Sequence, residues 1–190
     1  WESGIYFATK EISSQSGTAH RLSAPYQAFK TNDGYINIGA ANQPNWEKLC
    51  HAINKPEFIT KEEYLDNSSR MKNIDQLVKL LNEEFELRTT SEWVEILISA
   101  GVPCGPILNM HEVLNHEQIK DRETVIDLNH TKLGKIQNLS FPIKFSDNPQ
   151  SLKLPPPLLG EHNDEILKDL GYSDKEISEL KSESVITQSN

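Results

Sequence analysis

Residues 26–38 read Tyr-Gln-Ala-Phe-Lys-Thr-Asn-Asp-Gly-Tyr-Ile-Asn-Ile, and this stretch decides how the first half of the chain folds. Its two ends, residues 26–29 and 35–38, carry aromatic and apolar side chains and flank Asp33-Gly34. An Asp-Gly pair between two such runs favours a tight hairpin loop, because glycine accepts the backbone conformation that the turn requires. The stretch therefore predicts two antiparallel strands joined by residues 31–34.

Three later stretches have apolar residues at helical spacing. The first begins near Pro44, and the second covers residues 74–85. The third opens with Thr89 and Glu92, which form a capping-box pattern, and ends before Gly101. Together with the hairpin, these helices predict a small α+β domain with a short antiparallel sheet.

The remaining segments are shorter and less regular. Residues 102–107 form a stiff, Pro-containing segment that we expect to be a turn without strand or helix. A short helix is predicted over residues 110–114, and strands over 124–128, 133–136 and 141–145. His130 is expected to be an ordinary surface or turn residue. Beyond Pro155-Pro156-Pro157, two short helices are predicted, the second with a capping box at Ser173 and Glu176.

These features predict five parts along the chain. The chain begins on Trp1 rather than on methionine, so we expect it to be processed, deliberately shortened or a piece of a longer gene product. The expected parts are a linker and loop over residues 1–23, the small α+β domain over 24–147, a Pro-rich connector over 148–160, C-terminal helices over 161–181 and a tail over 182–190.

Composition excludes several classes of function. The chain of 190 residues has 19 basic and 28 acidic side chains and a net charge of −9, which disfavours binding to nucleic acid. No apolar run is long enough to cross a membrane. The two cysteines, Cys50 and Cys104, are isolated in sequence, a pattern typical of a reducing compartment. We therefore expect a soluble cytoplasmic protein.

Motifs for catalysis or metal binding are almost absent. Glycine-rich phosphate-binding loops and the serine-nucleophile motif do not occur. His111 and His116 are five residues apart, which places them on different faces of a helix, so no metal site is predicted. The small-residue loop of residues 16–21 could approach a ligand closely, and the alternative is a flexible loop with no such role.

Three segments form a recognisable set. They are Gly17-Thr18-Ala19-His20 leading into residues 24–35, residues 101–107, and residues 155–162 followed by Leu170-Gly171-Tyr172. Together these segments resemble class III CoA-transferases, also called the CaiB/BaiF family, and within it most closely the succinate–hydroxymethylglutarate CoA-transferase-like branch. The resemblance covers nearly the whole chain in order, and we identify the chain as the C-terminal portion of such a protein.

The resemblance implies a division of labour. Family members have a large Rossmann-like domain, then a small α+β domain, then a C-terminal segment that returns to the large domain. An aspartate of the large domain attacks the acyl-CoA carbonyl, and an aspartyl-CoA thioester follows. Nothing in this chain matches the region of that aspartate, so no catalytic residue is predicted here. The resemblance also implies a homodimer, with acyl-CoA and a carboxylic acid as substrates and no further cofactor.

The resemblance also assigns substrate-binding residues. In some relatives, a glycine-rich loop before the hairpin faces the active site and shields the intermediate from water. The matching residues here are Gly17, Thr18, Ala19 and His20, of which only Gly17 is a glycine. Two alternatives remain open: the same fold as part of an acyl-CoA racemase, or a non-catalytic interaction module.

Overall fold

A computed structural model describes residues 2–149, 152 and 154–187 and divides the chain into two compact units, residues 1–108 and 109–190. The predicted α+β domain of residues 24–147 thus spans both units. The reason lies in the hydrophobic core of the first unit, since its members run only from Ala24 to Cys104. Among the described residues, those after 108 add no side chain to that core.

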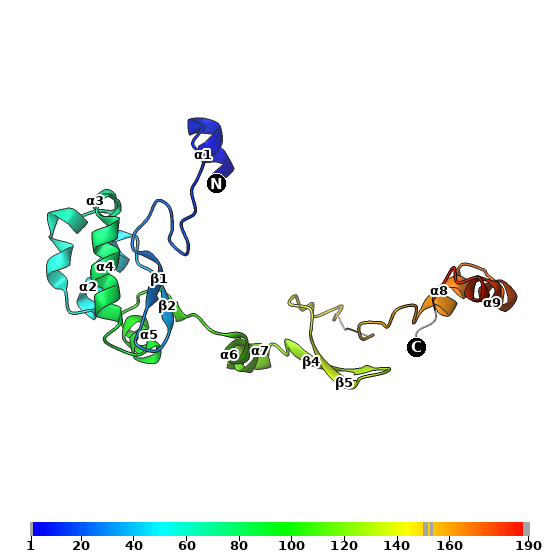
Figure 1. Ribbon diagram of the computed structural model, residues 1–190. Helices are drawn as coiled ribbons and strands as arrows, with labels where there is room; N and C mark the ends of the chain where they lie inside the picture. The colour runs from blue at the N-terminus through cyan, green and yellow to red at the C-terminus, as the bar shows by residue number, and fades with distance from the viewer. Residues whose placement is uncertain (1, 150–151, 153, 188–190) are drawn as a thin grey trace. The chain divides into compact units, whose positions relative to one another are not determined.

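The N-terminal unit combines one small sheet with several helices (Figure 1). The predicted hairpin and the three predicted helices are confirmed. Residues 2–9 form a helix without buried residues inside the stretch expected to be a linker and loop. The elements are α1 (Glu2–Thr9), β1 (Tyr26–Lys30), β2 (Tyr35–Gly39), α2 (Gln43–Ala52), two 3-10 turns (Pro56–Ile59 and Glu62–Tyr64), α3 (Asn67–Lys72), α4 (Ile74–Phe85), α5 (Thr90–Ser99) and β3 (Cys104–Pro106).

The sheet has the order β1-β2-β3, with all pairs antiparallel. Phe29 pairs with Ile36 across the hairpin, and Ile36 pairs with Pro106 on the other side. The expectation that residues 102–107 hold no strand was therefore wrong. Proline lacks the N–H of a central strand, but an edge strand such as β3 accepts it.

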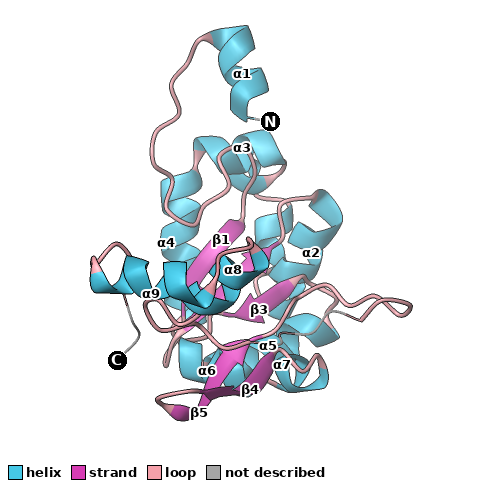
Figure 2. Cartoon of the chain, turned by 90° about the vertical axis from the view of Figure 1, so that its right-hand side faces the viewer, coloured by secondary structure: helices cyan, strands magenta, loops and turns pink. Residues whose placement is uncertain are grey.

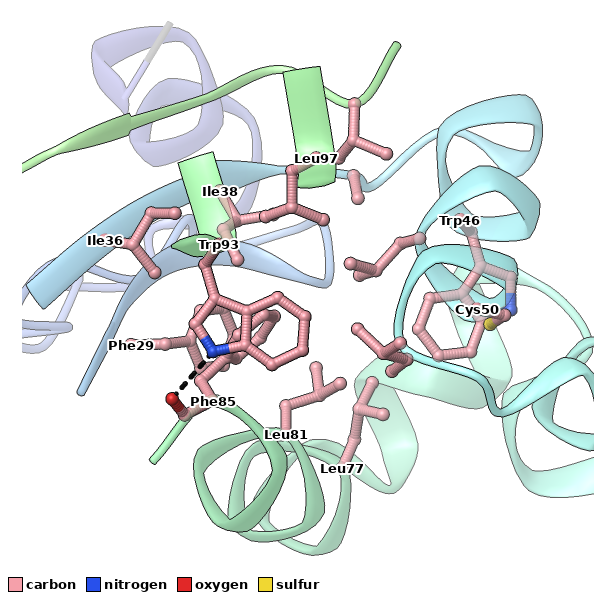
Figure 3. Packing of buried hydrophobic residues seen from close by; sticks show 14 of the residues in the cluster. Phe29, Ile36, Ile38, Trp46, Cys50, Leu77, Leu81, Phe85, Trp93 and Leu97 are labelled. Carbon is pink, nitrogen blue, oxygen red and sulfur yellow. Dashed lines mark hydrogen bonds between the residues drawn. The ribbon is translucent and has the colours of Figure 1, made fainter. Parts of the chain in front are cut away.

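The core lies between the sheet and the helices (Figure 3). Ile36 and Ile38 alternate with exposed Tyr35 and Asn37, so one face of β2 enters the core. In this core the indole N–H of Trp93 donates to the Phe85 carbonyl at 2.8 Å. Helices α2, α4 and α5 contribute Trp46, Leu49, Cys50, Leu77, Leu81, Phe85, Trp93 and Leu97, all buried.

A polar contact ties the hairpin loop to α5. One oxygen of Asp33 accepts hydrogen bonds from the backbone N–H and the hydroxyl of Thr90, at 2.8 and 2.9 Å. These bonds favour the carboxylate and lower the pKa of Asp33 below its usual range. The loop thus holds the first turn of α5 in place through a charge-assisted bond.

The C-terminal unit contains one hairpin and two pairs of short helices (Figure 2). The helix predicted over residues 110–114 and the first two predicted strands are confirmed, as is the capping box of Ser173 and Glu176. Residues 141–145 form no strand, so that prediction was wrong. The elements are α6 (Met110–Asn115), α7 (Glu117–Asp121), β4 (Val125–His130), β5 (Gly134–Leu139), α8 (Asn163–Asp169) and α9 (Asp174–Ser182).

His130 lies where the turn between β4 and β5 begins, which fits the turn alternative, and it is buried, so the surface alternative was wrong. Its Nδ1 accepts hydrogen bonds from the backbone N–H groups of Lys132 and Leu133, at 3.0 and 3.1 Å. The side chain thus organises the loop between β4 and β5, which a sequence pattern does not show. Parts of the predicted connector and tail, residues 150, 151, 153 and 188–190, lie outside the described residues. Within the described ranges, no helix is both long and apolar enough to span a bilayer.

Candidate functional site

The loop of residues 16–21, named here the small-residue loop, begins with a tight turn. The backbone N–H of Ala19 donates to the Ser16 carbonyl at 3.0 Å. Gly17 adopts a φ of +59° inside this turn, in the left-handed region that favours glycine. A Cβ built on Gly17 would meet nothing within 4 Å. Glycine is therefore favoured at position 17 by the positive φ of the turn, and the space around it is open.

The middle of the small-residue loop is fixed to strand β1. The hydroxyl oxygen of Thr18 accepts a hydrogen bond from the Ala28 N–H at 3.1 Å. Strand β1 is an edge strand, and this bond satisfies one of its outward backbone donors. Thr18 therefore serves as an anchor for the loop in this structure.

His20 makes the closest approach of the loop to the sheet. Its backbone N–H donates to the Tyr26 carbonyl at 2.9 Å, and its ring stacks on the Tyr26 ring with centroids 5.3 Å apart. Nδ1 of His20 accepts from the Leu22 N–H at 3.2 Å, an arrangement that requires this nitrogen to be unprotonated. The imidazole is thus held in one orientation by its own backbone neighbourhood.

A cavity of about 400 Å³ lies beside the loop. Ala19 and His20 line it together with Arg21 and the serines of residues 13–16, whereas Gly17 and Thr18 do not. The Arg21 guanidinium forms an ion pair with the Glu2 carboxylate at the edge of this cavity. The structure thus brings two of the four predicted site residues to one cavity and the other two to the turn and the strand.

Helix α3 supports the far end of the loop, and sequence reasoning missed it. Arg70 is 1% exposed, and burial lowers the pKa of its guanidinium. Its nitrogens donate to the carbonyls of Ala24, Ala41 and Tyr64 at 2.8, 2.9 and 3.1 Å. The local sequence, Asn67-Ser68-Ser69-Arg70, carries no apolar periodicity, so no pattern marks this arginine as buried.

The chain offers few groups for covalent chemistry. Burial raises the pKa of Cys50 to about 12, which keeps this thiol protonated at neutral pH. His116 accepts a hydrogen bond from the Gln118 N–H at the start of α7. Across the parts of the chain that the structure describes, no group of three potential ligands could hold a metal ion.

A second cavity, of about 670 Å³, lies in the C-terminal unit. Apolar side chains of β4 and of residues 141–145 line it, together with the ion pair between Lys144 and Glu123, whose atoms are 3.0 Å apart. None of the predicted site residues lies in this cavity. The small-residue loop therefore remains the predicted site.

Comparison with known proteins identifies the family. The family model described as CoA-transferase family III matches residues 1–163. The chain is 39% identical over 184 residues to succinyl-CoA:glutarate CoA-transferase of Homo sapiens, covering 96% of this chain and 42% of that protein. It is 38% identical over 138 residues to formyl-CoA:oxalate CoA-transferase of Rhodopseudomonas palustris strain BisA53, covering 72% of this chain and 32% of the relative.

A solved structure agrees with this assignment. The crystal structure of a CaiB/BaiF family protein from Brucella suis superposes with a TM-score of 0.72 and 30% sequence identity, over 88% of this chain and 43% of that one. The chain thus spans between about a third and two fifths of the length of these relatives, and it corresponds to their C-terminal portion. The 190-residue chain belongs to CoA-transferase family III.

Proposed function

We propose that this chain is the C-terminal part of an enzyme that moves CoA from an acyl-CoA thioester to a carboxylic acid. The alignment with succinyl-CoA:glutarate CoA-transferase carries the proposal, because it extends over 96% of this chain at 39% identity. The formyl-CoA:oxalate relative is named for different acids but the same exchange. Exchange of CoA between two carboxylic acids is therefore the chemistry that these names have in common.

The nucleophile of the proposed reaction lies outside this chain. A carboxylate of the large domain would attack the thioester carbonyl, release CoA as a thiolate and form a mixed anhydride. The thiolate would then attack the enzyme's own carbonyl of this anhydride and release the first acid, which leaves CoA on the enzyme until the second acid collects it. The high pKa of Cys50 supports this division, since that thiol is a poor nucleophile.

The small-residue loop contributes water exclusion in this proposal. Gly17, Thr18, Ala19 and His20 face the reacting centre, and the left-handed backbone at Gly17 lets the loop come close to a ligand. A thioester or anhydride is lost by hydrolysis, so a loop that excludes water favours transfer. The substrates are acyl-CoA and a carboxylic acid, and no additional cofactor is required.

We further propose a cytoplasmic homodimer that binds no nucleic acid. Cys50 and Cys104 are both free thiols, a state that a reducing compartment preserves. The net charge of −9 opposes polyanions, including the phosphates of CoA, so the large domain would hold the nucleotide part of the substrate.

The experiment compares this chain alone with a polypeptide in which it follows the large domain. Both are incubated with succinyl-CoA and a panel of dicarboxylic acids, and new CoA esters are measured by liquid chromatography and mass spectrometry. We expect exchange by the complete protein and none by the 190-residue chain. CoA exchange by the purified short chain would overturn the proposed division of labour.

The same assay separates the alternatives. A racemase would invert the α-carbon of a chiral 2-methylacyl-CoA without any acceptor acid, which chiral analysis of the product detects. An interaction module would do neither, even when joined to its large domain. Exchange that depends on an acceptor acid supports only the transferase.

A further inference from the structure

The side chain of Asn67 holds the chain just after the small-residue loop at two backbone positions. Its amide Nδ2 donates to the Leu22 carbonyl at 2.9 Å, and its Oδ1 accepts from the Ala24 N–H at 3.1 Å. One orientation of the amide satisfies both bonds, since the nitrogen faces an acceptor and the oxygen faces a donor. Asn67 therefore forms hydrogen bonds with both ends of the three-residue segment 22–24.

The helix that carries Asn67 is itself firmly held. Asp66 caps α3 by accepting from the Ser69 N–H at 2.7 Å. Arg70, one turn after Asn67 on the same face, binds the Ala24 carbonyl and the carbonyls of two other segments. Ala24 is therefore bound at its N–H by Asn67 and at its carbonyl by Arg70, and α3 forms a fixed base for the end of the loop.

We propose that Asn67 is a positioning residue that fixes the end of the small-residue loop and so sets the balance between CoA transfer and hydrolysis. The link to the reaction rests on the proposed function of the loop. Thr18 and His20 hold the middle of the loop on β1, and Asn67 holds its end. Loss of the Asn67 amide removes the bonds to Leu22 and to the Ala24 N–H and leaves the Arg70 bond to the Ala24 carbonyl, so the end of the loop is held less firmly and the loop admits more water.

The test uses Asn67→Ala with Asn73→Ala as a matched control, both in the complete protein. Asn73 is also half-buried, ends the same helix and binds backbone carbonyls of Glu63 and Ser69 at 3.2 and 2.9 Å. It contacts neither Leu22 nor Ala24 through these bonds. The two variants thus remove the same side chain from opposite ends of α3.

Two readouts are measured on both variants. Hydrogen exchange by mass spectrometry reports on the peptide containing Ala24, whose amide we expect to exchange about tenfold faster in Asn67→Ala than in Asn73→Ala. The ratio of succinyl-CoA hydrolysed to succinyl-CoA transferred should rise at least about fivefold in Asn67→Ala and stay at the wild-type value in Asn73→Ala. A purely structural role would lower total activity without changing that ratio.

Each outcome decides a separate claim. Unchanged exchange at Ala24 would overturn the positioning role of Asn67. Faster exchange with an unchanged ratio, in an enzyme that transfers CoA, would overturn the link to the reaction. If the complete wild-type protein transfers no CoA, the proposed function fails, while hydrogen exchange still decides whether Asn67 positions the loop. Asn67→Ser, whose hydroxyl is too short to reach both partners, provides the same comparison if the alanine variant does not fold.

Discussion

At the scale of single residues, Arg70 shows how one polar side chain can organise several loops. Besides three carbonyls, its guanidinium donates to the Gln43 side chain at 3.1 Å and lies over the Trp46 ring, 5.1 Å from the centroid. The planar guanidinium group holds its N–H donors in fixed directions, so it can bind carbonyls that lie on different sides of it. Arg70 thus joins the segments around Ala24, Ala41 and Tyr64 from a single position.

Replacing Arg70 by lysine should strongly destabilise the N-terminal unit. Lysine keeps the charge but concentrates its donors on one atom, so several buried carbonyls lose their partners. We expect Arg70→Lys to lower the free energy of unfolding by about 2–4 kcal/mol in urea denaturation. Arg88→Lys is the control, because Arg88 is exposed and lies over the Trp93 ring. If Arg70→Lys lowers the free energy of unfolding by no more than Arg88→Lys does, the buried hydrogen bonds of Arg70 do not stabilise the unit as described.

Gly17 gives a prediction about turnover. Valine at φ +59° is strained by about 1–2 kcal/mol, although no neighbouring atom obstructs its Cβ. In the complete enzyme, we expect Gly17→Val to reduce kcat at least about tenfold, with only a small fall in melting temperature. Steady-state kinetics and thermal melting are measured on the same preparation.

Gly134 supplies the control for Gly17. It has a φ of +71°, also with nothing within 4 Å of a built Cβ, and it lies in the hairpin of the C-terminal unit. Gly134→Val should cost similar backbone strain but leave kcat near the wild-type value. Equal losses of kcat in the two variants would mean that strain, rather than the place of the loop, explains the result.

Sequence reasoning reached the small-residue loop but not the residues that hold it. The loop could be found because it combines a run of small residues with the family resemblance. Asn67 and Arg70 could not be found, because both bind backbone atoms of Ala24, more than 40 positions away in sequence, and backbone atoms leave no residue signature. The place of His130 at a turn was among the expectations, but its burial was not, since that follows from bonds to the backbone of its own loop.

At the scale of elements, the link between Asp33 and α5 predicts a dependence on pH. Hydrogen bonds from Thr90 lower the folded-state pKa of Asp33, so the carboxylate stabilises the fold above the unfolded-state pKa of about 3.9. This contribution is lost as the pH falls through the lower folded-state value. We therefore expect Asp33→Asn to have a lower melting temperature than the wild type at pH 7. The difference between the two melting temperatures should shrink as the pH falls toward 2.

The measurement is a series of thermal melts between pH 2 and pH 7. Glu95→Gln, on the exposed side of α5, removes one carboxylate away from the hairpin loop and serves as the control. If the difference in melting temperature between the wild type and Asp33→Asn stays constant with pH, the proposed charge-assisted bond is contradicted.

Local signals explain which elements could be predicted. The hairpin of β1 and β2 and the capping boxes of α5 and α9 depend on residues within a few positions of one another, and all are confirmed. Strand β3 was missed because it pairs with β2 across more than 60 residues of chain and contains two glycine or proline residues in three. Residues 141–145 have the composition of a strand but no strand partner, and composition alone does not supply one.

At the scale of the whole molecule, the sequence could not locate the boundary between the units. The change in composition near residue 148 marks a Pro-rich connector, whereas the structure divides the chain at Leu108. That boundary follows the end of the first core, whose last buried member is Val102. A boundary that is set by where the core ends can be seen in the sequence only if a segment with the composition of a linker lies at the same place.

This division predicts that residues 1–108 fold without the rest of the chain. Their core of buried residues is complete from Ala24 to Val102. We expect a chain ending at Leu108 to unfold cooperatively, at a melting temperature within about 3 °C of the corresponding transition in the 190-residue chain, as followed by calorimetry. Absence of a cooperative transition in the shorter chain would show that residues 109–190 are required for this core.

The placement of the aromatic residues also gives the protein an internal optical label. All three tryptophans of the sequence precede residue 109, and Trp46 and Trp93, in the core of the first unit, are only 0% and 2% exposed. The red shift of indole emission during denaturation therefore reports the opening of that unit alone. Far-UV circular dichroism records helices in both units. The fluorescence and circular dichroism curves from one unlabelled sample thus report the unfolding of the two units separately. A difference between the midpoints of the two curves reports the unfolding of residues 109–190.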